Sequence, residues 1–241
     1  TFTLEYATSG YTGVIYAYGD TTITGGEFIQ NLTTTGRWNH PQVILTGVVE
    51  GYTAFTKVTG GTFTNKLSSE NIFRGVGKAT SDNFEVSGGT FNKSIPEGYC
   101  ADGFIPTKNA DGTYGVKEGK YVAKVGSTGY ETLEAAIKAV SSGKTVTLLD
   151  DITANGMDIK KSLTIDFNGK TLTVENPMVG STGTETNAIR FLKSGKTTIT
   201  VVLKNGTIKS SKARILIQNY ANLTVDNMTL DLSEQPLYGY V

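Results

Sequence analysis

The chain has 241 residues, with 22 basic and 22 acidic side chains, and 38% of its residues are hydrophobic, which is enough for a substantial core. This balanced charge gives no electrostatic reason to expect nucleic acid or an anionic membrane as a partner, and no apolar run approaches the roughly 18 residues of a membrane span. A single cysteine, Cys100, excludes an intramolecular disulfide framework, and a single histidine argues against His-based catalysis and metal ligation. We therefore expect no cofactor and no metal.

A six-residue pattern recurs along the chain: an apolar residue, any residue, Gly or Asn, any residue, Thr or Glu, and a second apolar residue. Each copy ends one short alternating strand and begins another, as Ile23–Phe28 does. Gly and Asn enter the left-handed backbone region at the least cost, so the third position predicts a tight bend. The predicted bend residues are Gly25, Gly60, Gly88, Gly169, Asn205 and Asn227.

The bends are too far apart for a simple hairpin meander, and the segments between them hold two further short strands. This arrangement predicts a parallel β-solenoid, in which each strand pairs with its equivalents one coil above and one coil below. The predicted fold is all-β: a right-handed parallel β-helix in two sections with a small helix-containing cap. An antiparallel β-sandwich with Gly-rich turns is the alternative.

The loop Thr35–Pro41 contains the only Trp, the only His and an Arg. Aromatic and planar polar side chains on an exposed loop are typical of sugar-binding sites, because the ring stacks on the pyranose face while polar groups bind hydroxyls. Arg37, Trp38, Asn39 and His40 are therefore a candidate glycan-binding site. In the structural alternative, Trp38 packs over the edge of the solenoid and His40 bonds to a loop carbonyl.

The middle of the chain has a different texture. Pro96, Pro106 and an Asn-Ala-Asp-Gly turn predict a terminating loop and small hairpin over residues 95–116. Residues 130–140 predict the only good helix, because they are rich in alanine and their apolar side chains lie on one face. Ser127 or Thr128 can cap this helix. A buried strand follows at 145–149.

The segments GYETLEAAIKAV and GKTVTLLDDI resemble the N-terminal cap of right-handed parallel β-helix modules in large surface proteins of Gram-positive bacteria, whose fold is related to that of pectate lyases. The segment GGTFNKSIPEGYCADGFIPTKNADGTYGV is similar to the end of such a module. The resemblance is most distinctive over residues 84–150. It implies an adhesin-like or structural protein that is extracellular or on the bacterial cell surface.

The motif that ends a module precedes the motif that starts one. The predicted domains are therefore 1–116, the C-terminal part of one β-helix module, and 117–241, a cap followed by the N-terminal part of a second. Uncapped coils expose unpaired strand edges, so we expect copies of the chain as partners. Either the chain is one period of a tandem array, or copies dock head to tail so that Tyr238–Val241 continues into Thr1–Tyr6. The alternative is an arbitrary boundary.

Some solenoids of this kind are enzymes that use clustered carboxylates and a basic residue on acidic polysaccharides. The candidates here are Asp150, Asp151, Asp158, Asp226 and Asp231, most of them at turns, where acidic residues are ordinary, and no arginine is beside an acidic cluster in the sequence. We therefore expect a non-enzymatic structural repeat of an extracellular stalk or filament. A carbohydrate-binding adhesin module is the second hypothesis and a polysaccharide lyase or hydrolase the third.

Overall fold

The computed structural model describes residues 1–5, 10–34, 39–183 and 185–235, and of Asn39 and His40 it describes the backbone alone. The chain is all-β, as predicted, with 52% of the described residues in strands and 6% in helices. It divides into two compact units, unit 1 (Thr1–Lys120) and unit 2 (Tyr121–Val241). The expected boundary between 116 and 117 falls inside strand β13 (Tyr114–Glu118), whose pairing with the strand before it belongs to unit 1.

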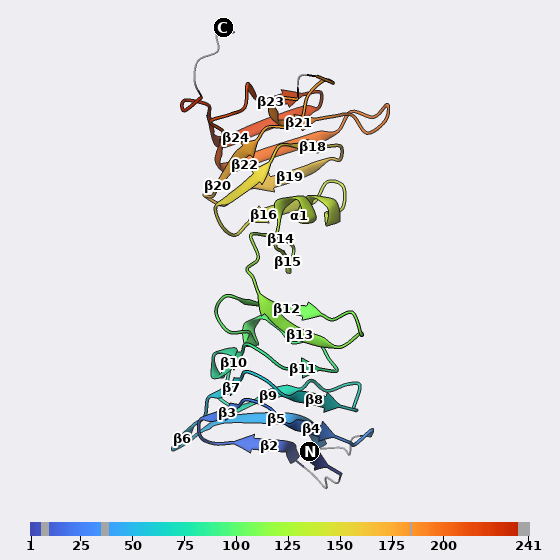
Figure 1. Ribbon diagram of the computed structural model, residues 1–241, viewed down its shortest axis with the longest axis vertical. Helices are drawn as coiled ribbons and strands as arrows, with labels where there is room; N and C mark the ends of the chain where they lie inside the picture. Colours follow the sequence, from blue (N-terminus) through green and yellow to red (C-terminus); the bar gives the residue numbers. More distant parts are fainter. Residues whose placement is uncertain (6–9, 35–38, 184, 236–241) are drawn as a thin grey trace. The chain divides into compact units, whose positions relative to one another are not determined.

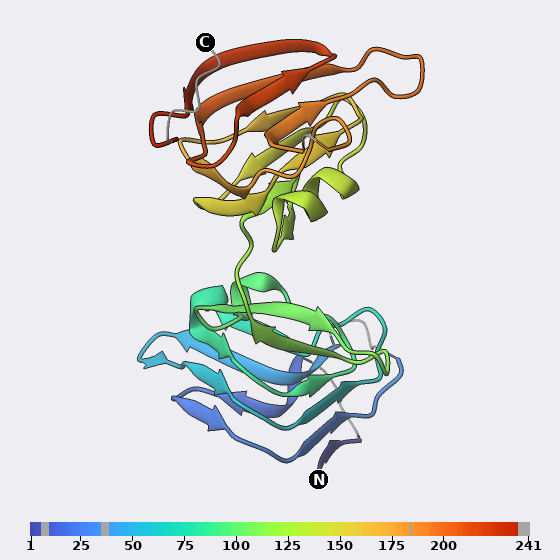
Figure 2. The same cartoon turned by 45° about the horizontal axis from the view of Figure 1, so that its top comes forward.

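Unit 1 has three sheets, and successive strands of the chain belong to the first, second and third sheet in turn (Figure 1 and Figure 2). The first sheet contains β1 (Phe2–Leu4), β4 (Glu27–Gln30), β8 (Thr62–Asn65) and β11 (Thr90–Phe91). The second contains β2 (Gly10–Ala17), β5 (Asn39–Val49) and β9 (Phe73–Gly77), and the third contains β3 (Thr21–Ile23), β7 (Thr56–Val58) and β10 (Phe84–Val86). All these strands pair in parallel, and β6 (Tyr52–Thr53) adds an antiparallel pair with β5.

The parallel register of the first sheet stacks phenylalanine rings in the core. Phe2, Phe28, Phe63 and Phe91 follow one another with ring centroids 5.2, 5.1 and 5.0 Å apart and interplanar angles of 9°, 6° and 16°. Phe63 and Phe91 are fully buried, because each lies among other core side chains, whereas Phe2 at the end of the stack is 59% exposed. The stack therefore stops with one face of its last ring uncovered.

One end of unit 1 is capped and the other is open. The hairpin of β12 (Phe104–Lys108) and β13 pairs antiparallel with β11, and the short 3₁₀ helices η1 (Ser81–Asn83) and η2 (Glu97–Tyr99) lie at the same end. A hairpin expected within residues 95–116 is thus present and extends to Glu118. At the other end, β1, β2 and β3 each pair with a single neighbour among the described strands.

Unit 2 has a large sheet and a small one. The large sheet includes β16 (Thr145–Leu148), β17 (Ile152–Asn155), β19 (Leu163–Asp166), β20 (Thr171–Asn176), β22 (Thr200–Lys209) and β24 (Asn222–Asp231). The small sheet consists of β18 (Met157–Ile159), β21 (Asn187–Phe191) and β23 (Ile215–Asn219). The first half of β22 pairs with β19 and its second half pairs with β20. One long strand thus lies beside two short strands.

The cap of unit 2 comes before its parallel strands. β14 (Ala123–Val125) forms a hairpin with β15 (Thr128–Tyr130), β14 also pairs antiparallel with β16, and helix α1 (Leu133–Ala139) packs beside them. The helix is shorter than the expected 130–140, because Tyr130 pairs with Ala123 in the hairpin. Its N-cap is Thr132, whose hydroxyl accepts a hydrogen bond from Ala135 N at 3.1 Å, instead of Ser127 or Thr128.

Parallel pairing predominates in both units. Among the described residues, antiparallel pairs between strands are confined to β5–β6 and to the caps formed by β11–β13, β12–β13, β14–β15 and β14–β16. The predominance of parallel pairs is incompatible with the antiparallel β-sandwich considered as the alternative fold.

Candidate functional site

The predicted bends are present in unit 1, but the left-handed residue is one position later than expected. Gly26, Gly61 and Gly89 have φ angles of 107°, 109° and 106°. Their predecessors Gly25, Gly60 and Gly88, which were expected to occupy this region, do not. The positions of the corners predicted from the sequence are correct, but the positive φ angle was predicted for the wrong glycine of each pair.

The first glycine of each pair has a different physical role. A Cβ at Gly60 would lie 2.5 Å from Thr24 O, and a Cβ at Gly88 would lie 2.2 Å from Thr59 O, so the carbonyl of the previous bend leaves no room for a side chain. At Gly25, the first of the series, a Cβ would meet nothing within 4 Å. Glycine at 60 and 88 therefore allows two bends to approach closely, and the equivalent space beside Gly25 is open.

In unit 2 the predicted bend residues do have positive φ angles: 79° at Gly169, 61° at Asn205 and 49° at Asn227. Asn205 lies within β22 and Asn227 within β24, so each strand bends without being interrupted. Asn227 Nδ2 donates to Asn205 Oδ1 at 3.2 Å, and Asn205 Nδ2 donates to Asp166 Oδ1 at 3.1 Å. The two asparagines thus adopt the left-handed backbone of the bends, and their side-chain amides also connect successive bends.

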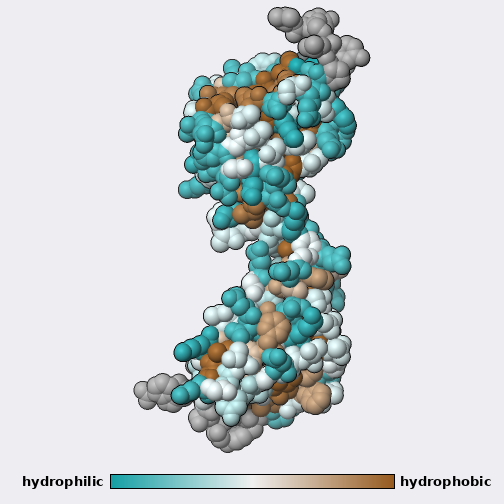
Figure 3. Space-filling view, turned by 90° about the vertical axis from the view of Figure 1, so that its left-hand side faces the viewer, coloured by the Kyte–Doolittle hydropathy of each residue, from teal (hydrophilic) through white to brown (hydrophobic). Residues whose placement is uncertain are grey.

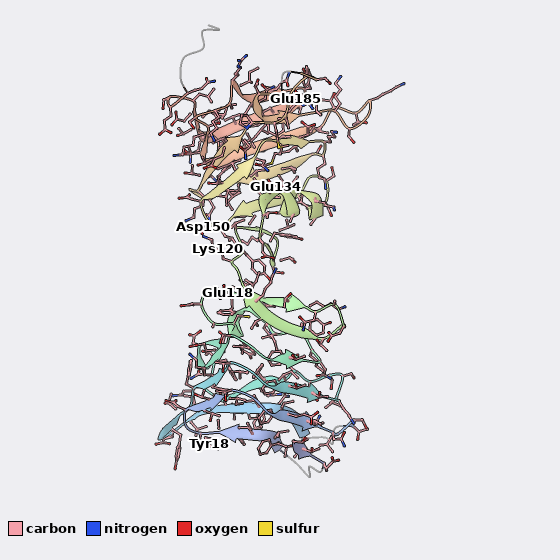
Figure 4. The ribbon with its side chains drawn as sticks, in the orientation of Figure 1. Tyr18, Glu118, Lys120, Glu134, Asp150 and Glu185 are labelled. Carbon is pink, nitrogen blue, oxygen red and sulfur yellow. The ribbon has the colours of Figure 1, made fainter. Side chains whose placement is uncertain are left out.

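The open edge of unit 1 is aromatic. Phe2 is 59%, Tyr11 45% and Tyr18 41% exposed. Tyr18, labelled in Figure 4, directly follows β2 and its ring stacks on Tyr16 at 4.6 Å. Burial and the hydrogen bond with Tyr18 raise the pKa of Tyr16 to about 12, so this phenol stays neutral across the physiological range. The edge thus exposes three aromatic side chains.

The open edge of unit 2 is aliphatic. Val225 and Leu230 of β24 are 44% and 46% exposed, whereas their register partners in β22, Leu203 and Ile208, are fully buried. Ile215 of β23 is 45% exposed. Figure 3 shows hydrophobic surface near the end of unit 2 that carries these strands. Each apolar stack of the core thus continues to an exposed member at the end of the unit.

The predicted glycan site falls mostly outside the described residues. Arg37 and Trp38 are not described, and for Asn39 and His40 only the backbone is, which pairs in β5 with Gly10 and Tyr11 of β2. The glycan-binding prediction for these residues therefore stays a prediction.

A polar hollow of about 380 Å³, missed in the sequence, is lined in part by Gln42, the residue directly after the loop Thr35–Pro41. Gln42 of β5 donates from Nε2 to the carboxylate of Glu70, and Arg74 of β9 lies 3.6 Å from the same carboxylate. Arg74 also lies 5.0 Å from the ring centre of Tyr11, and Tyr99 borders the hollow. Gln42 Oε1 is buried and has no hydrogen-bond partner. Glu70 and Arg74 are close in the sequence, and the pairing of β5 with β9 brings Gln42 to them.

The carboxylates considered for catalysis are engaged in structural bonds. Asp158 of β18 forms a two-pronged ion pair with Arg190 of β21, with both N–O distances 2.8 Å, and the hydrogen bonds from Arg190 lower the pKa of Asp158. Asp151 accepts a hydrogen bond from Thr171 N at 2.7 Å. Asp231 accepts from Ser233, which lowers the pKa of Asp231.

The remaining two acidic candidates are Asp150 and Asp226. Asp150, labelled in Figure 4, lies after β16 and accepts a hydrogen bond from Asp151 N at 2.8 Å. Asp226 lies on the exposed edge strand β24. In the described parts of the chain, no three His, Cys, Asp or Glu residues are grouped so as to hold a metal ion.

Cys100 has the character of a structural cysteine. It lies beside the third sheet, where its backbone forms a bridge with Val86. Burial, with a smaller contribution from Glu97, raises the pKa of Cys100 to about 11. Because the thiolate is the reactive form, this thiol is unsuited to nucleophilic chemistry at neutral pH.

Comparison with protein families, with curated proteins and with solved structures finds no match to the chain. No helix in the described residues is long and apolar enough to cross a membrane.

Proposed function

We propose that the chain is a non-enzymatic structural repeat of an extracellular bacterial stalk or filament, in which each unit is a section of a right-handed parallel β-helix. The observation that carries the proposal is that, among the described residues, each unit has a cap at one end and a strand edge without a further partner strand at the other. The cap of unit 1 is the β12–β13 hairpin, and that of unit 2 is the β14–β15 hairpin with α1. Such a section is extended only at its open end.

The cyclic order of the strands supports the β-helix. In unit 1 the chain visits the first, second and third sheets and then returns to the first, always in parallel, as a coiled chain does. Phe2 and Leu230 are the exposed last members of apolar stacks. A further coil on either edge would bury such a side chain, worth about 1.5–3 kcal/mol for a fully buried large residue.

The bacterial surface location rests on the resemblance of residues 84–150 to β-helix modules of Gram-positive surface proteins. In the proposed stalk, neighbouring modules supply the further coils and stack head to tail. The structural use of Asp151, Asp158 and Asp231 favours this role over that of a polysaccharide lyase or hydrolase, because a catalytic carboxylate has to be available to its substrate.

Single-molecule pulling on the full chain tests the proposal, with handles at its two ends. A stalk segment made of two β-helix sections should unfold in two discrete events, each releasing about 120 residues, or roughly 40 nm of contour length at about 3.5 Å per residue. The variant Phe63→Ala should lower the force of one event and leave the other unchanged. Gradual extension at low force without discrete events would contradict the proposal.

We propose a glycan-binding site on unit 1 as a second candidate function. The observation that favours it is the polar hollow at Gln42, Glu70 and Arg74, in which Gln42 belongs to the same strand, β5, as Asn39 and His40. Its carboxylate and guanidinium neutralise each other, so a neutral sugar suits it better than an anion.

A glycan array probed with the full chain tests this second candidate. Trp38→Ala should abolish binding without changing the unfolding midpoint. Tyr52→Ala, which removes an aromatic side chain that is 60% exposed, is the matched control and should retain binding. A wild-type chain that binds no glycan would eliminate the site.

A further inference from the structure

Strand β24 presents a long free edge. Nine of its ten residues, all but Asn227, pair in parallel with β22 between Asn222 and Asp231, and none of the other described strands pairs with it. Its outer edge has no partner strand among the described residues, and apolar side chains lie along it. A long exposed edge of this kind is a template for pairing with a further chain. The question is which strand fits it.

The sequence of β24 has the same chemical order in both directions. Before the bend, Leu223 and Val225 lie over the buried β22 residues Val201 and Leu203. After the bend, Leu230 lies over buried Ile208, and Met228 also packs against the core.

The left-handed residue Asn227 causes this symmetry, because it shifts the alternation of side chains by one position. The strand therefore reads apolar, polar, apolar up to the bend and apolar, polar, apolar beyond it. The polar members are Thr224 and Thr229, and both are exposed.

We propose that β24 pairs antiparallel with β24 of a second copy of this chain, about a twofold axis between Asp226 and Asn227. In this register Leu223 lies opposite Leu230 of the second copy. Val225 lies opposite Met228 of the second copy, so every apolar side chain of the edge gains an apolar neighbour.

The bend does not obstruct this pairing. The twofold axis passes through it, so both strands turn at the same point, and the first half of each β24 lies on the second half of the other. The interface is isologous and closes at two copies. It concerns unit 2 alone and does not depend on the stalk proposal. A second copy on the β24 edge takes the place of a head-to-tail neighbour there, so the two arrangements are alternatives at this edge.

Burial of the two exposed aliphatic side chains supplies the driving force. Val225 and Leu230 are each nearly half exposed in the single chain, and the dimer covers both of them in both copies. A lysine on this edge would place a charge against the apolar side chains of the second copy, which is how natural edge strands prevent pairing.

Sedimentation equilibrium on the full chain, from micromolar to millimolar concentration, measures the association. The wild type should form dimers and no larger species. Val225→Lys should be monomeric. Met178→Lys, at a side chain that is 55% exposed outside β24, should dimerise like the wild type. Phe2→Lys, on the open edge of unit 1, should also dimerise, whereas head-to-tail docking would be lost in this variant.

Disulfide trapping checks the register. In a Cys100→Ser background, Thr224→Cys and Thr229→Cys are made as separate variants, since these positions face each other across the proposed axis. A mixture of the two should oxidise to a crosslinked heterodimer, and each variant alone should crosslink much less.

Any of four results would overturn the inference. They are a wild type that stays monomeric, association that continues beyond two copies, dimers that survive Val225→Lys, and dimers that fail to crosslink between 224 and 229. None of these results bears on the two-event unfolding expected of the stalk segment, so the two proposals fail separately.

Discussion

Units 1 and 2 make the same corner between two strands by different chemistry. In unit 1 a Gly-Gly pair interrupts the strand, as between β3 and β4, and the first glycine of the pair admits the carbonyl of the previous bend. In unit 2 an asparagine bends a continuous strand and hydrogen-bonds to the previous bend through its side chain. Successive corners can thus stack in two ways. Glycine, which has no side chain, lets the backbones approach closely, and asparagine joins the corners by side-chain hydrogen bonds.

The cores of the two units also differ in the side chains that they stack. Unit 1 stacks phenylalanine rings 5.0 to 5.2 Å apart, close to the spacing of neighbouring strands, so each ring follows its own strand. Unit 2 stacks aliphatic side chains in register, as in Leu163 with Val201 and Ile165 with Leu203. We expect unit 1 to be the more sensitive to single substitutions in its stack, because each ring contributes more buried area.

The largest effect should come from the aromatic stack. Phe63→Ala removes a fully buried ring between two others and should lower the unfolding free energy of unit 1 by about 3–5 kcal/mol. Hydrogen exchange resolved along the full chain should show faster exchange in unit 1 and unchanged exchange in unit 2.

Phe2→Ala is the matched control, since this ring is at the exposed end of the same stack. It should cost much less than Phe63→Ala, because Phe2 is 59% exposed. Equal losses at the two positions would show that the stack does not stabilise unit 1 by burial.

The Gly-Gly corner should give the next largest effect. In Gly88→Ala the new methyl group would lie 2.2 Å from Thr59 O, so the bend has to move, at a cost of about 1–3 kcal/mol. Gly25→Ala meets nothing and should leave the unfolding free energy within a few tenths of a kcal/mol, or raise it slightly. Chemical denaturation of both variants measures the contrast, and similar destabilisation by both would refute the close-approach role.

The asparagine corner should respond differently. Asn205→Ala loses the side-chain bonds to Asp166 and Asn227 and places a Cβ residue without a local polar group at a φ of 61°, so unit 2 should lose about 1–3 kcal/mol. Asn205→Gly keeps the backbone freedom and loses only the hydrogen bonds, so it should cost less. If the glycine variant were the worse of the two, the bend would not be limited by its left-handed backbone.

The corners illustrate how much of the fold the sequence could predict. Gly and Asn at a fixed spacing located the bends, since these residue types have a local conformational meaning. The sequence could not show that Gly61 has the positive φ while Gly60 faces Thr24 O, because that carbonyl comes from the previous circuit. Tyr130 was assigned to the helix because its local sequence suits a helix, and only its pairing with Ala123 places it in β15.

The candidate sites were predicted less well, for the same reason. Gln42 and Glu70 carry no local motif, and the parallel register alone brings them into one hollow. Asp158 and Arg190 also looked unrelated in the sequence and form an ion pair across β18 and β21. The self-complementary order of β24 was legible in the sequence, but its importance depends on the strand being at an edge, which is a property of the topology.

The smallest expected effect concerns the ion pairs that connect neighbouring strands in the two units. Asp158 and Arg190 in unit 2 make two bonds of 2.8 Å and are about three-quarters or more buried, whereas Lys57 and Glu85 in unit 1 make one contact of 2.6 Å and are more exposed. Asp158→Asn should therefore lower the unfolding free energy by about 0.5–1 kcal/mol at neutral pH, and Glu85→Gln by less.

The pH dependence of this difference follows from the lowered pKa of Asp158. A carboxylate whose folded pKa lies below its unfolded value, about 3.9, contributes its stability above that value and loses it as the pH falls through the folded pKa. The gap in unfolding free energy between the wild type and Asp158→Asn should thus be constant from pH 7 to about pH 5 and close below about pH 4. Denaturant titrations at a series of pH values measure it, and a gap that widened on acidification would mean that Asp158 is destabilised by its surroundings instead of held by Arg190.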